Sequence, residues 1–129
     1  MFKPTAAFSG FSVLDLVKAK AFYRETLGLN VEETKMGLQL HLPGGFTVFA
    51  YEKKDHQPAT FTILNLIVDH IDESLAELAA KGVEFKQYHS PEIPQDEKGI
   101  LRGLSVGMGP DIAWFEDPSL NILSILQEK

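Results

Sequence analysis

Alternating apolar and polar positions over residues 8–14 form the first ordered segment of the chain. Phe8 and Ser12 share one face of this segment, as side chains four positions apart do in a β-strand. A helix is predicted to follow, because apolar residues then recur at helical spacing. Asp15 offers a side-chain oxygen to cap the first turn of this helix, and Gly28 is a favourable residue for its end.

Three further segments of the first half have the pattern of short strands. They cover residues 29–35, 38–42 and 46–52. The last two are separated by Pro43, Gly44 and Gly45, which suit a tight reversal of the chain. The first half is therefore predicted to fold as strand, helix, strand, strand, strand.

The second half repeats this order. Residues 60–68 are predicted to form its first strand, with Ile63 and Asn65 on one face. The helix that follows has Asp72 and Glu73 near its start, an apolar stripe of Leu75, Leu78 and Ala79, and Lys81-Gly82 at its end. Residues 83–88 are predicted to resume the sheet, and residues 112–116 and 121–126 to form a final hairpin.

Between its helix and its final turn, the second half is longer than the first by about 21 residues. The surplus lies in residues 89–110 and is rich in glycine and proline. A loop of this length in a compact domain is usually functional or mobile. We expect this segment either to cover a cavity as a lid or to form a surface excursion.

The two halves also match in the spacing of their helix ends. Asp15 and Gly28 are 13 residues apart, Asp69 and Gly82 are 13 residues apart, and the offset between the copies is 54. A duplicated unit of this kind cannot bury its sheet face alone. We therefore expect the halves to complete one another around a shared core and a shared cavity.

Composition limits the classes of function. The chain has 129 residues, of which 44% are hydrophobic, and this suits one globular domain over residues 1–129. Its net charge is −6 and its basic residues are scattered, which argues against a nucleic-acid partner. It has no cysteine, no signal-peptide pattern and no apolar run of about 20 residues, so we expect a cytoplasmic protein with no membrane span.

Three motifs, in this order, resemble the vicinal oxygen chelate superfamily, which contains glyoxalases, bleomycin resistance proteins and extradiol dioxygenases. They are Asp15-Leu16 through Ala21-Phe22-Tyr23 to Leu27-Gly28-Leu29, the second helix ending at Lys81-Gly82-Val83, and the closing Ala113-Trp-Phe-Glu-Asp117-Pro118-Ser-Leu-Asn121. The resemblance implies an α+β fold in which two tandem βαβββ modules, about 5–53 and about 59–129, form a curved mixed eight-stranded sheet around a cleft. It also implies a homodimer. It does not fix the chemistry, because the superfamily includes isomerases, dioxygenases, thiol transferases and drug-sequestering proteins.

The resemblance also indicates where metal-dependent members hold their ion, on the opening and closing strands of each module. At these positions the chain carries Phe8, Ile63 (or Thr62, one residue away in register), Phe49 and Ser124. A divalent ion needs several nitrogen or anionic oxygen donors, which these side chains do not supply. The four histidines, His41, His56, His70 and His89, lie on different elements with no helical pair among them. We therefore expect no metal and no other cofactor.

Apolar walls with a few polar groups are typical of a small-molecule pocket. The residues predicted to line it are Phe8, Ser12, His41, Phe49, Ile63, Asn65, Trp114 and Ser124. His41 is included because it lies on a predicted strand near Glu52. The leading hypothesis is a metal-free protein that binds an apolar, aromatic or cationic small molecule. The alternatives are a metal-dependent lyase, isomerase or dioxygenase of the glyoxalase type, and a structural module with a filled core.

One position departs from the superfamily pattern. Members usually have glycine before the asparagine of the last turn, where this chain has Leu120 before Asn121. Leucine at positive φ costs about 1 to 2 kcal/mol. We therefore expect this turn to adopt another geometry.

Overall fold

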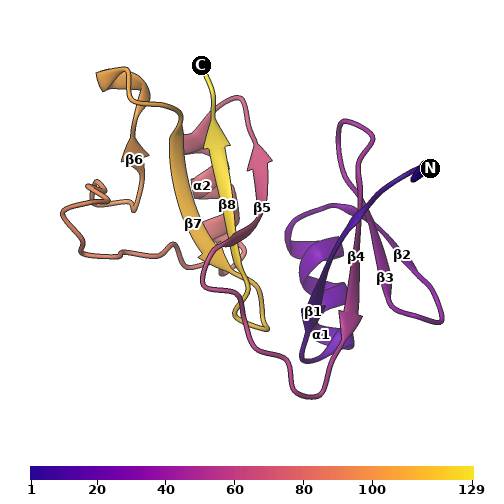
Figure 1. Ribbon diagram of the computed structural model, residues 1–129. Coiled ribbons are helices and arrows are strands. Elements are labelled where there is room, and N and C mark those ends of the chain that lie inside the picture. The colour runs from indigo at the N-terminus through magenta and orange to yellow at the C-terminus, as the bar shows by residue number, and fades with distance from the viewer. The chain divides into compact units, whose positions relative to one another are not determined.

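The computed structural model describes residues 1–129, which is the whole chain. It contains two compact units, Met1–Pro58 and Ala59–Lys129, and each is described by itself (Figure 1). Each unit has a four-stranded sheet with parallel and antiparallel pairs and one main helix. The predicted α+β class and the two tandem βαβββ modules are confirmed.

The first unit follows the predicted order of elements. They are β1 (Ser9–Val13), α1 (Leu16–Ala21), a π-helical segment η1 (Phe22–Thr26), β2 (Asn30–Glu33), β3 (Leu38–His41) and β4 (Thr47–Glu52). In the sheet the strands lie in the order β1-β4-β3-β2, with β1 parallel to β4 and the other pairs antiparallel. The reversal between β3 and β4 passes through Gly44 and Gly45, which both have positive φ.

The helix of the first unit begins and ends where its sequence indicates. Asp15 is its N-cap, and Asp15 Oδ1 accepts a hydrogen bond from Lys18 N at 3.1 Å. Gly28 ends it at a φ of 69°. The change from α- to π-helix at Phe22 was not predicted. The Tyr23 ring in this segment is fully buried and lies against Phe11, with centroids 5.7 Å apart.

The core of the first unit lies between its helix and one face of its sheet. The fully buried apolar residues are Val13, Ala19, Tyr23, Leu38, Leu40 and Ala50. Because successive strand residues point to opposite faces, Ser12 and Phe49 lie on the other face, which no helix of this unit covers. We call this uncovered face the open face of the first sheet.

The second unit has the same order of elements with one insertion. They are β5 (Thr62–Ile67), α2 (Ile71–Ala80), β6 (Leu101–Arg102), a 3₁₀ segment η2 (Leu104–Val106), β7 (Asp111–Glu116) and β8 (Ile122–Gln127). The strand order β5-β8-β7-β6 matches that of the first sheet, with β5 parallel to β8. Buried Leu64, Phe115, Leu123 and Ile125 face α2, and the opposite face is the open face of the second sheet.

Helix α2 packs on β7 and β8. The side chain of the N-cap residue His70 makes no capping hydrogen bond. Instead, Gln127 Oε1 on β8 accepts a hydrogen bond from Ile71 N at 2.9 Å. Ala79 is exposed, so its place in the predicted apolar stripe is wrong; Ile71 is the buried residue of this helix.

The prediction that residues 83–88 resume the sheet is confirmed in part, although they form no regular strand. This segment makes one antiparallel bridge, Phe85 to Phe115, and one further sheet bond from Lys86 N to Trp114 O at 2.8 Å. The chain then leaves the sheet and returns as β6, which pairs with the other end of β7. We call residues 89–110, which contain β6 and η2, the excursion.

The turn between β7 and β8 has the geometry that leucine was expected to avoid. Leu120 has a φ of 68° and is exposed. The expectation of another geometry is therefore wrong. The cause is Asp117, which is buried and whose Oδ1 accepts hydrogen bonds from Ser119 N at 2.8 Å and Asn121 N at 2.9 Å.

No helix of the structure has both the length and the apolar character that crossing a membrane requires.

Candidate functional site

An aromatic cluster lies on the open face of the first sheet. Phe49 on β4 contacts Phe8 edge to face, with centroids 6.5 Å apart, and lies almost parallel to Tyr51 at 6.2 Å. Gly10 is the residue paired with Phe49 on β1. Phe8 is 72% exposed and Tyr51 is 37% exposed, so this cluster offers apolar area to solvent.

The chain at Gly37 passes close to β4 and to the Phe49 ring. Gly37, before β3, has a φ of 153°, and a Cβ there would lie 3.0 Å from Phe49 Cζ and 2.3 Å from Ala50 O. No larger residue fits between the two chains at this point. Gly37 is visible in the sequence, but the sequence interpretation did not single it out.

Polar groups lie on the same open face. Ser12 Oγ and His56 Nδ1 are 2.6 Å apart, and His41 Nε2 lies 3.0 Å from Glu32 Oε1. The expected neighbour of His41 was Glu52, and this is wrong: Glu52 Oε1 accepts a hydrogen bond from Leu16 N at the start of α1. A hydroxyl beside an imidazole can hold or pass a proton and can orient a polar ligand group.

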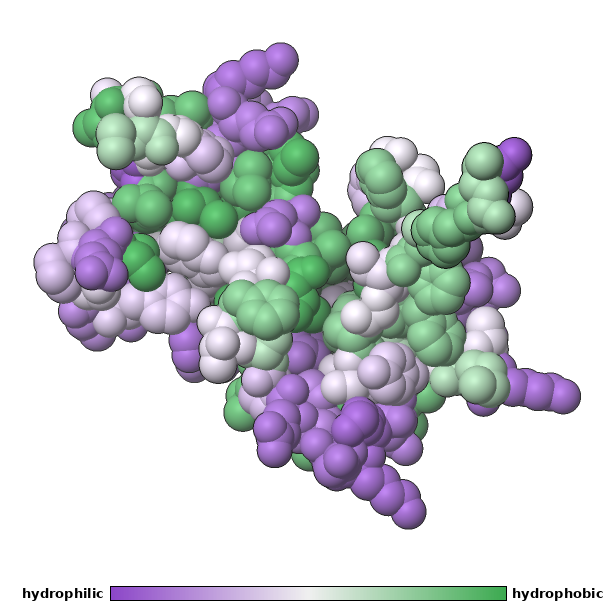
Figure 2. Space-filling view, viewed as in Figure 1, coloured by the Kyte–Doolittle hydropathy of each residue, from purple (hydrophilic) through white to green (hydrophobic).

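The open face of the second sheet carries a row of three predicted residues. Asn65, Ser124 and Trp114 are paired across β5, β8 and β7, and Ser124 Oγ donates a hydrogen bond to Asn65 Oδ1 at 2.6 Å. Ser124, the central residue of this row, is fully buried. Figure 1 shows α2 behind β7 and β8, and Figure 2 shows apolar and weakly polar residues over the side of these strands turned to the viewer.

A β-bulge changes which residues of β5 reach this face. The register shifts between Thr62 and Leu64, with Ile63 as the extra residue. Thr62 therefore lies on the same face as Asn65, although simple alternation places it opposite. Trp114 Nε1 donates a hydrogen bond to Thr62 Oγ1 at 3.1 Å. Ile63 is half-buried in the bulge, and its predicted role as a pocket residue stays a prediction.

Three residues of these faces were missed by the sequence interpretation. Tyr51 lies two positions after Phe49 and shares its face, so the alternation of β4 could have identified it. His56 follows β4 in an irregular segment, where no pattern predicts its contact with Ser12. Tyr88 packs edge to face on Trp114 with centroids 5.6 Å apart, and only the tertiary structure shows this.

The side chains at the expected ligand positions do not fit the divalent ion of the superfamily. Phe8 and Phe49 present carbon, and the Ser124 hydroxyl is buried and already bonded to Asn65. Neither unit brings together three or more His, Asp or Glu side chains in a geometry that could hold a metal. We therefore assign no metal-dependent step to these residues.

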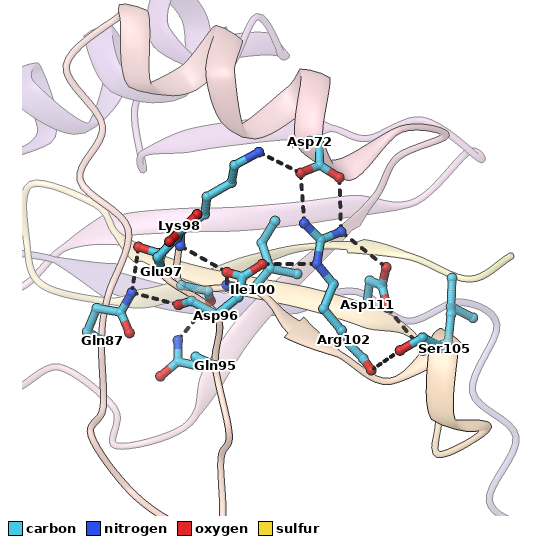
Figure 3. Close-up of polar contacts among 12 residues, drawn as sticks. Asp72, Gln87, Gln95, Asp96, Glu97, Lys98, Ile100, Arg102, Ser105 and Asp111 are labelled. Carbon is cyan, nitrogen blue, oxygen red and sulfur yellow. Dashed lines mark hydrogen bonds and ion pairs between the residues drawn. The ribbon is translucent and has the colours of Figure 1, made fainter.

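A cluster of charged residues ties the excursion to α2 (Figure 3). The Arg102 guanidinium donates to both carboxylate oxygens of Asp72, at 2.8 and 2.9 Å, and through Nε to Asp96 Oδ2 at 3.0 Å. Lys98 Nζ adds a bond to Asp72 Oδ1 at 3.0 Å. Asp111 Oδ1 on β7 accepts a hydrogen bond from Leu104 N at 3.0 Å, which fixes the far end of β6.

These contacts shift the pKa values of the carboxylates. Hydrogen bonds from Arg102 and Lys98 hold the pKa of Asp72 well below its usual range. Burial acts to raise the pKa of Asp96, but bonds from Ile100 N, Arg102 and Lys98 N outweigh it and the pKa is lowered. Burial raises the pKa of the Tyr88 hydroxyl. The Asp72 and Asp96 carboxylates are therefore ionised at neutral pH, and their bonds to Arg102 hold the excursion to α2.

Two hollows of the second unit lie beside the excursion. One of 380 Å³ is lined by Leu104, Gly107, Gly109, Pro110 and Glu128, and one of 280 Å³ by residues between Gln87 and Gln95. Neither is lined by a predicted pocket residue. The proposed role of the excursion as a lid stays a prediction, and its middle part is held by the charged cluster.

Comparison with solved structures identifies the fold. TnmS3, an antibiotic binding protein from Streptomyces sp. CB03234, matches with a TM-score of 0.66 and 23% identity over 99% of this chain and 100% of that one. The fosfomycin resistance protein FosX from Listeria monocytogenes matches with a TM-score of 0.69 and 15% identity, over 99% and 96%. A member of the glyoxalase/bleomycin resistance protein/dioxygenase superfamily from Sphaerobacter thermophilus matches with a TM-score of 0.64 and 23% identity, over 95% and 98%.

The chain has the vicinal oxygen chelate fold. The predicted resemblance is therefore confirmed at the level of the fold, and these matches cover nearly the full length of both chains. No protein-family model and no curated protein matches the sequence. Because proteins with the vicinal oxygen chelate fold perform unrelated chemistry, the function must be argued from the side chains.

Proposed function

We propose that this protein binds a small organic molecule of apolar, aromatic or cationic character through the open faces of its sheets, without a resident metal. The observation that supports this most directly is the exposed aromatic cluster of Phe8, Phe49 and Tyr51. Aromatic rings left accessible on a rigid sheet supply binding free energy, and neighbouring polar groups orient the ligand.

The polar groups have distinct roles in this proposal. Ser12 with His56, and Thr62 with Trp114, offer hydroxyl and imidazole groups next to aromatic rings. Glu32 beside His41 adds negative charge on the first open face. With a net charge of −6, the protein favours a cationic over an anionic ligand. An aromatic ring also attracts a cation placed over its face.

The known proteins of similar fold are consistent with ligand binding. One is described as an antibiotic binding protein and another as a fosfomycin resistance protein. At 15 to 23% identity they share the fold with this chain, and their ligands are not transferred to it.

The experiment is a thermal-shift screen of three compound sets: neutral aromatic, cationic aromatic and aliphatic. A ligand that binds only the folded state raises the unfolding midpoint. Compounds that do so are titrated against Phe49→Leu, which we expect to bind about three- to tenfold more weakly, the range for loss of one aromatic contact. The matched control is Phe46→Leu, in the turn before β4, which should leave the affinity unchanged.

Two results would contradict the proposal. Stoichiometric metal that survives dialysis would favour the enzyme of the glyoxalase type. A screen in which no compound raises the midpoint would favour the structural module with a filled core. A direct readout is also available, because Trp114 is the only tryptophan and its emission reports from the open face of the second sheet.

A further inference from the structure

The excursion contains a glutamine whose side chain joins three backbone groups. Gln95 Oε1 accepts a hydrogen bond from Tyr88 N at 2.9 Å, and Gln95 Nε2 donates to Lys86 O and Gly99 O, both at 2.8 Å. Gln95 is half-buried, so these bonds are shielded from competing water. Its side chain thus replaces the sheet pairing that residues 86–88 lose where the chain leaves β7.

Tyr88 lies at the point where this replacement matters. The last sheet bond before it is from Lys86 N to Trp114 O, and directly after it the chain turns at His89, which has a φ of 52°. The Gln95 carboxamide is therefore the group that fixes the Tyr88 backbone. The Tyr88 ring packs edge to face on Trp114, with centroids 5.6 Å apart and planes at 78°.

The turn that carries Gln95 is itself held firmly. Asp96 Oδ1 accepts bonds from Lys98 N and Ile100 N, both at 2.9 Å, and Asp96 Oδ2 accepts one from Arg102 Nε. Figure 3 shows this turn between Gln87 on one side and the Arg102 and Asp72 pair on the other. Contacts with α2 and β6 therefore fix the position of Gln95. The hydrogen bond from Tyr88 N to Gln95 Oε1 in turn fixes the Tyr88 backbone.

We propose that Gln95 is a positioning residue that holds Tyr88 against Trp114. It thereby sets how much aromatic surface a ligand can contact on the open face of the second sheet. The effect on ligand binding rests on the function proposed above, whereas the positioning of Tyr88 against Trp114 does not. A flat aromatic ligand gains an edge contact from a correctly held Tyr88, whereas an aliphatic ligand gains little from it.

Gln87 provides a matched control. It also joins residues 86–88 to the turn, through bonds from Gln87 Nε2 to Asp96 O at 3.1 Å and Glu97 O at 3.2 Å. It is exposed, and it makes no bond to the Tyr88 backbone. Gln95→Ala should shift Trp114 emission to longer wavelength and raise its quenching by acrylamide, and Gln87→Ala should change neither.

The double variant separates positioning from general stability. In Tyr88→Ala, the Trp114 emission should already be shifted, and adding Gln95→Ala should shift it no further while still lowering the unfolding midpoint. The proposal would be overturned if the emission shifts of the two single variants added in the double variant. It would also be overturned if Gln95→Ala left the acrylamide quenching of Trp114 unchanged while Tyr88→Ala shifted the Trp114 emission.

The ligand arm uses the aromatic compounds found in the thermal-shift screen. Gln95→Ala should weaken a flat aromatic compound about three- to tenfold and an aliphatic compound less than twofold, the difference an edge contact makes. Equal weakening of both would overturn the role in selectivity. A screen without any binder would defeat the proposed function, and the emission measurements on the free protein would still decide whether Gln95 positions Tyr88.

Discussion

Leu120 keeps a left-handed backbone because its neighbours leave it no alternative. Asp117 O accepts a hydrogen bond from Leu120 N at 3.0 Å, and the Asp117 carboxylate bonds the amides on either side of Leu120. Asn121 Nδ2 adds a bond to Asp117 Oδ2 at 3.0 Å. A residue in a sparsely populated region persists only where the surroundings determine it more than once, as they do here.

Leu120→Gly should therefore stabilise the protein by about 1 kcal/mol, the strain that glycine does not carry at positive φ. The side chain is 56% exposed, so its removal costs little burial. Urea unfolding measures the change. Leu120→Ala is the control, because it removes most of the same side chain and keeps the strain. Equal stabilities for the two variants would show that the left-handed backbone is not strained.

At the scale of elements, the excursion depends on the charged cluster more than on sheet pairing. The strand β6 has two residues, yet Arg102 at its end binds Asp72 on α2 and Asp96 in the preceding turn. Both carboxylates are partly exposed, at 47% and 31%, so each pair contributes modestly. Together these pairs join the excursion to α2.

The excursion should loosen in acid. Because the pKa of Asp72 is lowered in the folded protein, its contribution to stability is complete above its unfolded value of about 3.9 and is lost as the pH falls further. Below about pH 4 the unfolding midpoint of the wild-type protein should drop more steeply than that of Asp72→Asn. Glu73→Gln, one residue along the same helix, should keep the wild-type profile. A wild-type profile identical to that of Asp72→Asn would exclude this linkage.

At the scale of the whole molecule, two copies of one unit have diverged in what their open faces carry. The first face has stacked rings with two histidines nearby, and the second has a tryptophan, a threonine and a buried serine bonded to an exposed asparagine. Neither shows the set of donors that a divalent ion requires. The homodimer that the resemblance implies stays a prediction.

We expect the purified protein to carry less than stoichiometric metal after dialysis, and added Zn²⁺, Ni²⁺ or Mn²⁺ to leave its unfolding midpoint unchanged, since binding to the folded state alone would raise it. Elemental analysis and thermal unfolding measure the two quantities. Chelator-treated protein is the reference. A midpoint that rises with a saturable dependence on one of these ions would show a site that the side chains at the expected positions do not reveal.

How far the sequence could predict the structure depended on whether a feature is local. The order of elements, the Asp15 cap, the Gly28 end and the turn at Gly44 and Gly45 follow from patterns within a few residues, and the structure confirms them. Residues 83–88 pair with the sheet only through Phe85 and Lys86, because alternating apolar and polar residues do not show how far a segment stays paired.

The candidate site divides in the same way. Alternation placed Phe8 and Ser12 on one face from the sequence alone, whereas Phe49 was indicated by the resemblance to the superfamily. The partners of Ser12, His41 and Trp114 could not be predicted, because each is 9 to 52 residues away and depends on register, a bulge or a segment outside the sheet.

The sequence by itself therefore determined the duplicated order of elements, because that order follows from residue type and short-range spacing. The resemblance to the superfamily indicated the ligand positions, and the sequence places carbon-rich side chains such as Phe8 and Phe49 there. Tertiary structure alone decided that Thr62 joins the open face, that Asp117 holds Leu120 at positive φ, and that Gln95 holds Tyr88 beside Trp114. Each of these requires the backbone to bring distant or shifted groups within hydrogen-bond distance, which no local pattern specifies.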